Sequence, residues 1–131
     1  MTPSAVLLDA SALLALVFEE DGVPRVWEAV RRGAAISAVN AAEVAARLGG
    51  EGWTGEEIEG FFGESSIEVV PFDRPAALLS GSYHQPTRHL GLSLGDRACL
   101  ATARQLGLAV LTADRAWAEL ELDGVKVICI R

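Results

Sequence analysis

The chain has 131 residues, half of them apolar, and a formal net charge of -7 at pH 7. A chain of this length can bury one continuous core, so we expect residues 1–131 to form a single domain. The negative charge argues against broad, sequence-independent binding of nucleic acid, which requires a basic surface. Any chemistry on phosphate groups must therefore be local.

Membrane spans and export signals are not expected. Charged residues or glycines interrupt every apolar run before the roughly 18 residues that a span requires. Residues 1–18 are apolar, but they lack a basic start and contain Asp9 and Ser11, which argues against a signal peptide. Cys99 and Cys129 lack metal-binding spacing and are expected to be reduced core thiols. The sequence therefore predicts a soluble, cytoplasmic protein.

Short aliphatic runs alternate with helix-like segments along the chain, which is typical of a parallel sheet. The runs are nearly continuous in apolar character, as expected of strands that helices cover on both faces. We therefore predict an α/β fold, a three-layer α/β/α sandwich with a central, mainly parallel five-stranded sheet. The predicted strands are residues 5–8, 34–36, 67–70, 109–111 and 125–130.

Turn and cap residues mark the segments between these strands. A helix that begins near Ser37 is expected to end before the two glycines at residues 49–50. Residues 51–63 are expected to form an amphipathic helix followed by a loop. Residues 80–92 contain glycine, proline and both histidines, and are expected to be an irregular loop.

Two acidic residues follow predicted strands. Asp9 comes directly after the first strand, and Asp114 comes shortly after the fourth. The carboxyl ends of strands are where open α/β sheets bind ligands, although either residue could instead be a helix N-cap. Ser11 and Thr112 could add hydroxyl ligands, or they could bond backbone amides.

Two further acids belong to predicted helices. Asp96 lies three residues after Ser93, which is the spacing of a capping box, and a capping acid can still face a cleft. Glu43 lies inside the helix that begins near Ser37, at the border of its buried face. The alternative role for Glu43 is a surface ion pair with Arg47, four residues later.

The placement of these four acids favours one shared site. Carboxylates about 4 Å apart repel by roughly 4 kcal/mol per pair at an effective dielectric constant near 20, so a cluster requires a cation or raised pKa values. An oxygen-only ligand set without His or Cys selects Mg²⁺ or Mn²⁺ over zinc. A divalent metal of this kind lowers the pKa of its bound water.

Nearly the whole chain resembles the PIN-domain ribonucleases, and among them the VapC-type toxins of prokaryotic toxin–antitoxin pairs. The resemblance rests on four segments, of which the third is the most specific. They are Leu-Asp-Ala-Ser-Ala-Leu at 8–13, Asn-Ala-Ala-Glu-Val at 40–44, Gly-Leu-Ser-Leu-Gly-Asp-Arg-Ala-Cys-Leu-Ala at 91–101 and Leu-Thr-Ala-Asp at 111–114.

The resemblance implies a metal-dependent endoribonuclease that cleaves RNA with Mg²⁺ or Mn²⁺. It also implies a homodimer and a VapB-like antitoxin whose C-terminal segment occupies the active-site groove. The residues at the family's acidic positions are Asp9, Glu43, Asp96 and Asp114, with Ser11 and Thr112 at its accessory hydroxyl positions. Arg97 and Arg115 could contact a nucleic-acid backbone or form surface ion pairs.

Two alternatives remain open at this point. A phosphoacceptor receiver-like signalling domain also gathers acids at strand ends, but it needs an acidic pair after the first strand, where this chain offers only Asp9. A PIN fold could also serve as a binding or scaffold module without turnover. Retention of all four acids weighs against that second alternative.

Overall fold

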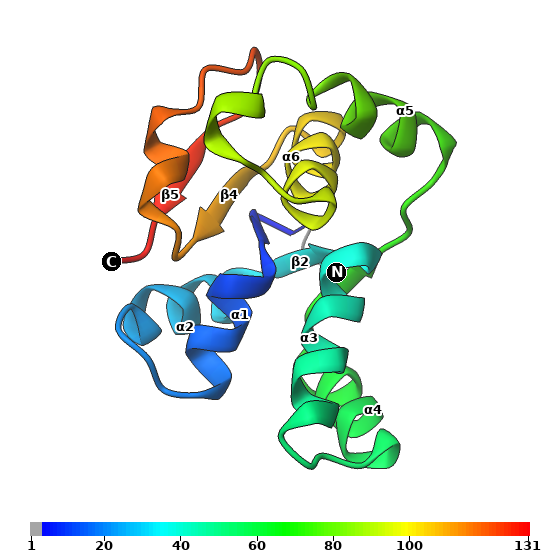
Figure 1. Ribbon diagram of the computed structural model, residues 1–131. Helices are drawn as coiled ribbons and strands as arrows, with labels where there is room; N and C mark the ends of the chain where they lie inside the picture. Colours follow the sequence, from blue (N-terminus) through cyan, green and yellow to red (C-terminus); the bar gives the residue numbers. More distant parts are fainter. Residues whose placement is uncertain (1–3) are drawn as a thin grey trace.

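A computed structural model describes residues 4–131 (Figure 1). Its five strands form one sheet in the order β3-β2-β1-β4-β5, and every neighbouring pair is parallel. The strands are β1 (Val6–Leu8), β2 (Ala34–Ser37), β3 (Glu68–Val70), β4 (Ala109–Thr112) and β5 (Val127–Cys129). Each overlaps a predicted strand, and only β2 and β4 extend one residue beyond the prediction.

Six α-helices and two short 3₁₀ helices connect the strands. The α-helices are α1 (Ala10–Val17), α2 (Val23–Arg32), α3 (Ala38–Gly50), α4 (Gly55–Glu64), α5 (Arg74–Ser82) and α6 (Leu94–Leu106), and the 3₁₀ helices are η1 (Arg88–Leu90) and η2 (Arg115–Glu119). Figure 1 shows α1 to α4 gathered on one side of the molecule and α5 and α6 on the other.

Two hydrophobic clusters fill the space on either face of the sheet. Successive residues of β1 point to opposite faces, so Leu8 joins the cluster under α1 and α3, whereas Leu7 joins the cluster under α6. Trp117 of η2 is buried in the second cluster. Because both faces are covered, the central strands β1, β2 and β4 are almost entirely apolar, whereas the edge strand β3 exposes Glu68. The predicted three-layer sandwich is confirmed.

Three predicted boundaries were wrong. Residues 51–63 were expected to begin as a helix and end as a loop, but α4 begins at Gly55 after its Thr54 cap and continues to Glu64. The predicted loop over residues 80–92 begins inside α5, whose last turn buries Ser80, and Arg88–Leu90 forms η1. Thr87 Oγ1 also donates to the Tyr83 carbonyl at 2.6 Å, so this connection has its own internal order. Helix α3 continues through both glycines to Gly50, because nothing there requires a left-handed turn.

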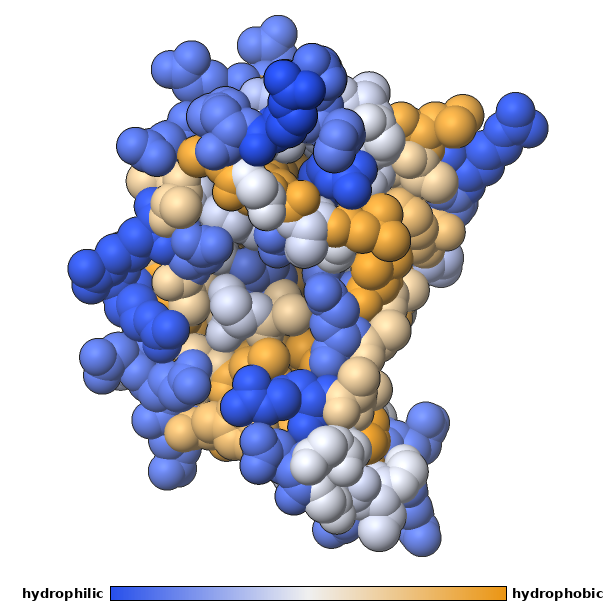
Figure 2. All heavy atoms as spheres, in the orientation of Figure 1, coloured by the Kyte–Doolittle hydropathy of each residue, from blue (hydrophilic) through white to orange (hydrophobic). Residues whose placement is uncertain are grey.

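The surface mixes polar and apolar side chains. Figure 2 shows hydrophilic side chains projecting around the margin of this face, with hydrophobic residues exposed between them. Trp27 of α2 is 56% exposed, so it is not a core residue. Cys99 is buried, Cys129 is partly buried, and both are free thiols. Among residues 4–131, no helix is both long enough and apolar enough to cross a membrane.

The order of the strands reverses at the centre of the sheet. From β1 the chain moves outward through β2 to β3, and it then returns to the opposite side of β1 to form β4. Such a reversal is the topological switch point at which open α/β sheets bind ligands, beyond the carboxyl ends of the strands. Asp9 follows β1 and Asp114 follows β4, so the chain places both acids at this switch point.

Candidate active site

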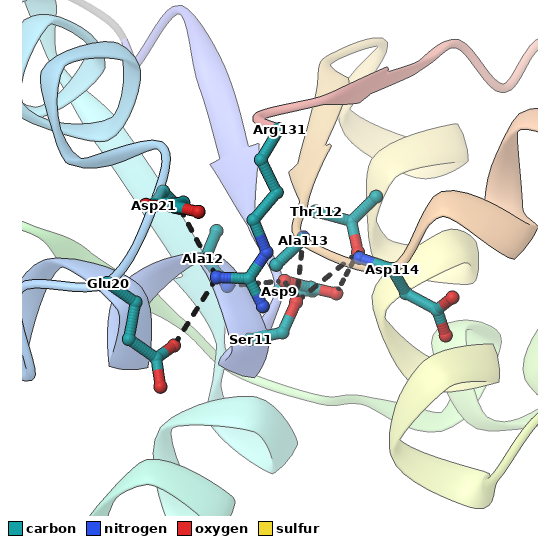
Figure 3. Close-up of polar contacts among 9 residues, drawn as sticks. All are labelled: Asp9, Ser11, Ala12, Glu20, Asp21, Thr112, Ala113, Asp114 and Arg131. Atoms are coloured by element: carbon teal, nitrogen blue, oxygen red, sulfur yellow. Dashed lines mark hydrogen bonds and ion pairs between the residues drawn. The ribbon is translucent and has the colours of Figure 1, made fainter.

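Asp9 lies at the centre of the candidate site and is 4% exposed. It is the N-cap of α1, and its Oδ1 accepts from the Ala12 amide at 2.8 Å and from Ser11 Oγ at 2.7 Å. Its Oδ2 accepts from Thr112 Oγ1 at 2.6 Å. Figure 3 shows these contacts converging on one carboxylate. Asp9 therefore caps α1 and lies at the centre of the candidate site at the same time.

Burial controls the protonation of Asp9. Desolvation raises the pKa of its carboxyl group from 3.8 to about 6, although hydrogen bonds from Thr112, Ala12 and Ser11 lower it, and the nearby charge of Asp96 raises it further. The site therefore disfavours an isolated negative charge. A proton or a cation beside Asp9 relieves that penalty.

The two hydroxyl groups connect β1 to β4 across the switch point. Ser11 Oγ accepts from the Ala113 amide at 2.9 Å, and Thr112 Oγ1 accepts from the Asp114 amide at 3.1 Å. Both hydroxyls donate their protons to Asp9. Each hydroxyl thus bonds a backbone amide and orients the central carboxylate at the same time.

Asp96 and Glu43 approach the same place from α6 and α3. Asp96 belongs to the predicted capping box, in which its carboxylate accepts from the Ser93 amide at 2.9 Å. Burial raises the pKa of the Cys99 thiol well above its usual value, and the charges of Asp9, Asp96 and Glu43 raise it further. Three of the four predicted acids are therefore near enough to Cys99 for their charges to act on its thiol.

Glu43 does not form the predicted alternative ion pair. Arg47 instead pairs with Glu51 at 3.2 Å, whereas Glu43 Oε1 accepts from Asn40 Nδ2 at 2.7 Å. Asn40 and Gly95, which also contact Glu43, were missed by the sequence analysis. The available signal was an amide three residues before an acid on one helix, which places the two side chains as neighbours.

Asp114 is the acid whose side chain is least connected to the rest of the candidate site. It is exposed, and its carboxylate accepts from the Ala116 amide at 3.0 Å as the N-cap of η2. Figure 3 shows its side chain directed away from Asp9. Its backbone amide nevertheless bonds Thr112, so its main chain is part of the Asp9 network.

The two candidate arginines form no ion pair within residues 4–131. Arg115 Nε donates to the backbone carbonyl of Arg131 at 3.1 Å. Arg97 is half-buried, and its Nε has no hydrogen-bond partner in the described chain. The surface ion pairs that were one expected role are therefore absent from the described chain.

The acids offer the oxygen donors that hard divalent cations prefer, but they do not form a complete set of protein ligands around one position. Within the described residues, no three side chains of His, Cys, Asp or Glu lie close enough to chelate one ion together. Mg²⁺ does not require such a cage, since it keeps several waters and binds one or two carboxylates. The oxygen-only donors and the desolvated carboxylate of Asp9 fit this mode of binding.

Comparison with protein families gives a match to the PIN domain over residues 6–122. The chain belongs to the PIN domain family. Its sheet order also differs from the 2-1-3-4-5 order of receiver domains, which removes the receiver-like alternative. A comparison with curated proteins finds none that matches.

Several solved structures share this PIN fold. A toxin–antitoxin complex from Klebsiella pneumoniae is 23% identical with a TM-score of 0.72, over 92% of this chain and 95% of that one. VapBC2 from Rickettsia felis, bound to a promoter DNA fragment, is 13% identical with a TM-score of 0.73, over 95% and 98%. PAE2754 from Pyrobaculum aerophilum is 24% identical with a TM-score of 0.60, over 98% and 92%. Because all three identities are below 25%, these structural likenesses show a shared fold and no more.

Proposed function

We propose that this PIN domain protein is a metal-dependent endoribonuclease and the toxin of a VapBC-type pair, acting in the cytoplasm with residues 1–131 as one unit. The observation that carries the proposal is the buried, desolvated carboxylate of Asp9, with Asp96 and Glu43 close by. PIN domain proteins generally use divalent metal ions, and the VapC toxins among them are typically nucleases.

The four acids would hold Mg²⁺ or Mn²⁺ together, one or two of them as direct ligands and the others through metal-bound water. They are Asp9, Asp96, Glu43 and Asp114, the last from the η2 turn. The bound metal supplies a water of lowered pKa and a positive charge at the phosphate. Ser11 and Thr112 keep Asp9 in one orientation. Arg97 and Arg115 are the proposed contacts to the RNA backbone, because each directly follows one of the acids in the chain and a guanidinium group suits phosphate oxygens.

The proposed partner is a VapB-like antitoxin. Several fold neighbours are toxin–antitoxin complexes, and this chain carries an apolar groove of about 310 Å³ between α1, α2 and α4. The groove is lined by Leu16, Trp27, Val30, Phe61, Glu64, Ser65 and Ile67. An antitoxin segment with both apolar and basic residues suits this groove. The apolar residues match its lining, and the basic residues are attracted by the net charge of -7 on this chain.

A cleavage assay tests this proposal. Wild-type protein freed of any antitoxin is expected to cleave structured RNA with Mg²⁺ or Mn²⁺ and to lose this activity in chelator. Asp9→Asn is expected to reduce cleavage at least about 100-fold, because it removes the central carboxylate. Asp73→Asn is the matched control, since Asp73 also caps a helix but follows the outer strand β3.

The same assay distinguishes a PIN module without turnover. If the wild-type protein binds RNA or antitoxin but cleaves no RNA at any metal concentration, the scaffold alternative replaces the nuclease. Equal cleavage by wild type and Asp9→Asn would also reject the four-acid site.

A further inference from the structure

Asn40 is a buried amide placed between two elements of the candidate site. It is 1% exposed and lies in the first turn of α3. Its Nδ2 donates to Glu43 Oε1 at 2.7 Å and to the Gly95 carbonyl at 3.0 Å. Both partners are oxygen atoms, so the NH₂ end of the amide faces them and its orientation is fixed by these contacts. One side chain thus joins an acid of α3 to the first turn of α6.

This amide is poorly suited to a purely structural role. Its Oδ1 is buried and accepts no hydrogen bond from residues 4–131. A buried acceptor without a partner is destabilising, which offsets much of what the two donated bonds contribute. An apolar side chain of similar size would avoid that cost. The Asn40 amide is therefore better explained by its contacts with Glu43 and the Gly95 carbonyl.

Gly95 provides the space that Glu43 occupies. A Cβ atom on Gly95 would clash with the Glu43 carboxylate, whereas Cβ atoms on Gly49 and Gly60 would meet nothing. Gly95 lies in the first turn of α6, directly after Leu94. Any larger residue at this position would therefore displace the Glu43 carboxylate.

We propose that Asn40 is a positioning residue that holds the Glu43 carboxylate over Gly95, in the orientation required for metal binding. This inference rests on the proposed metal-dependent function. Glu43 belongs to an exposed stretch of α3, where a free glutamate side chain samples several rotamers. Fixing it in advance removes that entropic cost from metal binding.

The contact itself is testable in metal-free wild-type protein. Asn40 is the single asparagine of the chain, so selective ¹⁵N-asparagine labelling identifies its side-chain amide signal in the spectrum of the uniformly ¹⁵N-labelled protein. Two donated hydrogen bonds in a buried site predict that its protons exchange with water at least about 100-fold more slowly than those of exposed Gln85. Exchange as fast as that of Gln85 would overturn the inference without any variant.

Calorimetric titration with Mn²⁺ tests the consequence for the metal. Asn40→Ala is expected to bind Mn²⁺ about 10- to 100-fold more weakly than wild type, the usual effect of removing a partner of a metal ligand. Asn40→Asp keeps the shape but places a carboxylate against Glu43, so an equal or larger loss is expected. Thr102→Ala is the matched control, since it removes a buried hydrogen bond of α6 that points to Ala98.

The kinetic pattern separates positioning from simple loss of stability. Asn40→Ala should need about 10- to 100-fold more Mn²⁺ for half-maximal cleavage and should regain cleavage when Mn²⁺ is raised. If wild-type protein binds Mn²⁺ and Asn40→Ala binds it equally well, this inference fails while the proposed function stands. If the wild-type protein binds no Mn²⁺, the proposed function fails and the inference fails with it.

Discussion

Asp9 combines three accepted hydrogen bonds with a raised pKa of about 6. Between pH 3.8 and about 6 the folded state keeps a proton that the unfolded state has released. The free energy of unfolding of the metal-free protein therefore falls as pH rises through this window, by up to about 3 kcal/mol from this residue. Below the window this contribution is constant, and above it the loss is complete.

Asp9→Asn should remove this pH dependence. Urea denaturation of metal-free wild type and variant, at intervals from pH 4 to pH 7, is expected to show the variant gaining about 3 kcal/mol relative to wild type as pH rises. Comparing the two proteins at each pH cancels the titration of the other acids. A stability difference that does not change with pH would contradict the raised pKa of Asp9.

The individual residues of the site were partly predictable. Asp9 and Asp114 follow strand ends, and this position is visible in the order of residues alone. The role of Asn40 was not, because its effect depends on how α3 and α6 face each other, which separates residues 40 and 95 by 55 positions in the chain. The direction of the Asp114 side chain likewise depends on the η2 turn.

At the scale of elements, α6 and α4 offer a controlled comparison. Both begin with a capping box, formed by Ser93 and Asp96 in α6 and by Thr54 and Glu57 in α4. Ser93→Ala and Thr54→Ala should each reduce the free energy of unfolding by about 1 kcal/mol. Calorimetry should show about 10-fold weaker Mn²⁺ binding for Ser93→Ala alone, because only that box includes a site carboxylate. Equal Mn²⁺ affinity in both variants would show that the α6 cap does not orient Asp96.

The elements themselves were predicted well where local signals agree. All five strands were identified because an apolar run bounded by turn residues is a local pattern. The connection over residues 80–92 was misread, because Gly81 and the histidines suggested a loop, while the packing of Ser80 and Tyr83 gives the segment its structure. Tertiary packing that involves distant residues leaves no such local signal.

At the scale of the whole molecule, the homodimer that the family resemblance implies needs an apolar face. Such a face lies on α3, α4 and the edge strand β3, where a groove of about 500 Å³ includes Ala41, Ala45, Phe62 and Val69. Val69 is 42% exposed on β3, which has an unpaired outer edge. Exposed apolar edge strands associate readily unless they are covered.

Sedimentation velocity tests this face. Wild-type protein is expected to sediment as a dimer at micromolar concentration, and Val69→Lys as a monomer, because a buried charge without a partner strongly opposes association. Leu78→Lys is the control, since Leu78 is 64% exposed on α5 and outside this face. A wild-type monomer, or a dimer that persists in Val69→Lys, would exclude this interface.

The central claim is that the carboxylates at the switch point of the sheet hold a divalent metal. Anomalous diffraction from crystals soaked in Mn²⁺ tests it most directly. The account predicts an anomalous peak bound by Asp9 and Asp96, with Glu43 or Asp114 beside it. Soaked crystals that show no peak there, or Mn²⁺ bound only elsewhere on this acidic surface, would contradict the account.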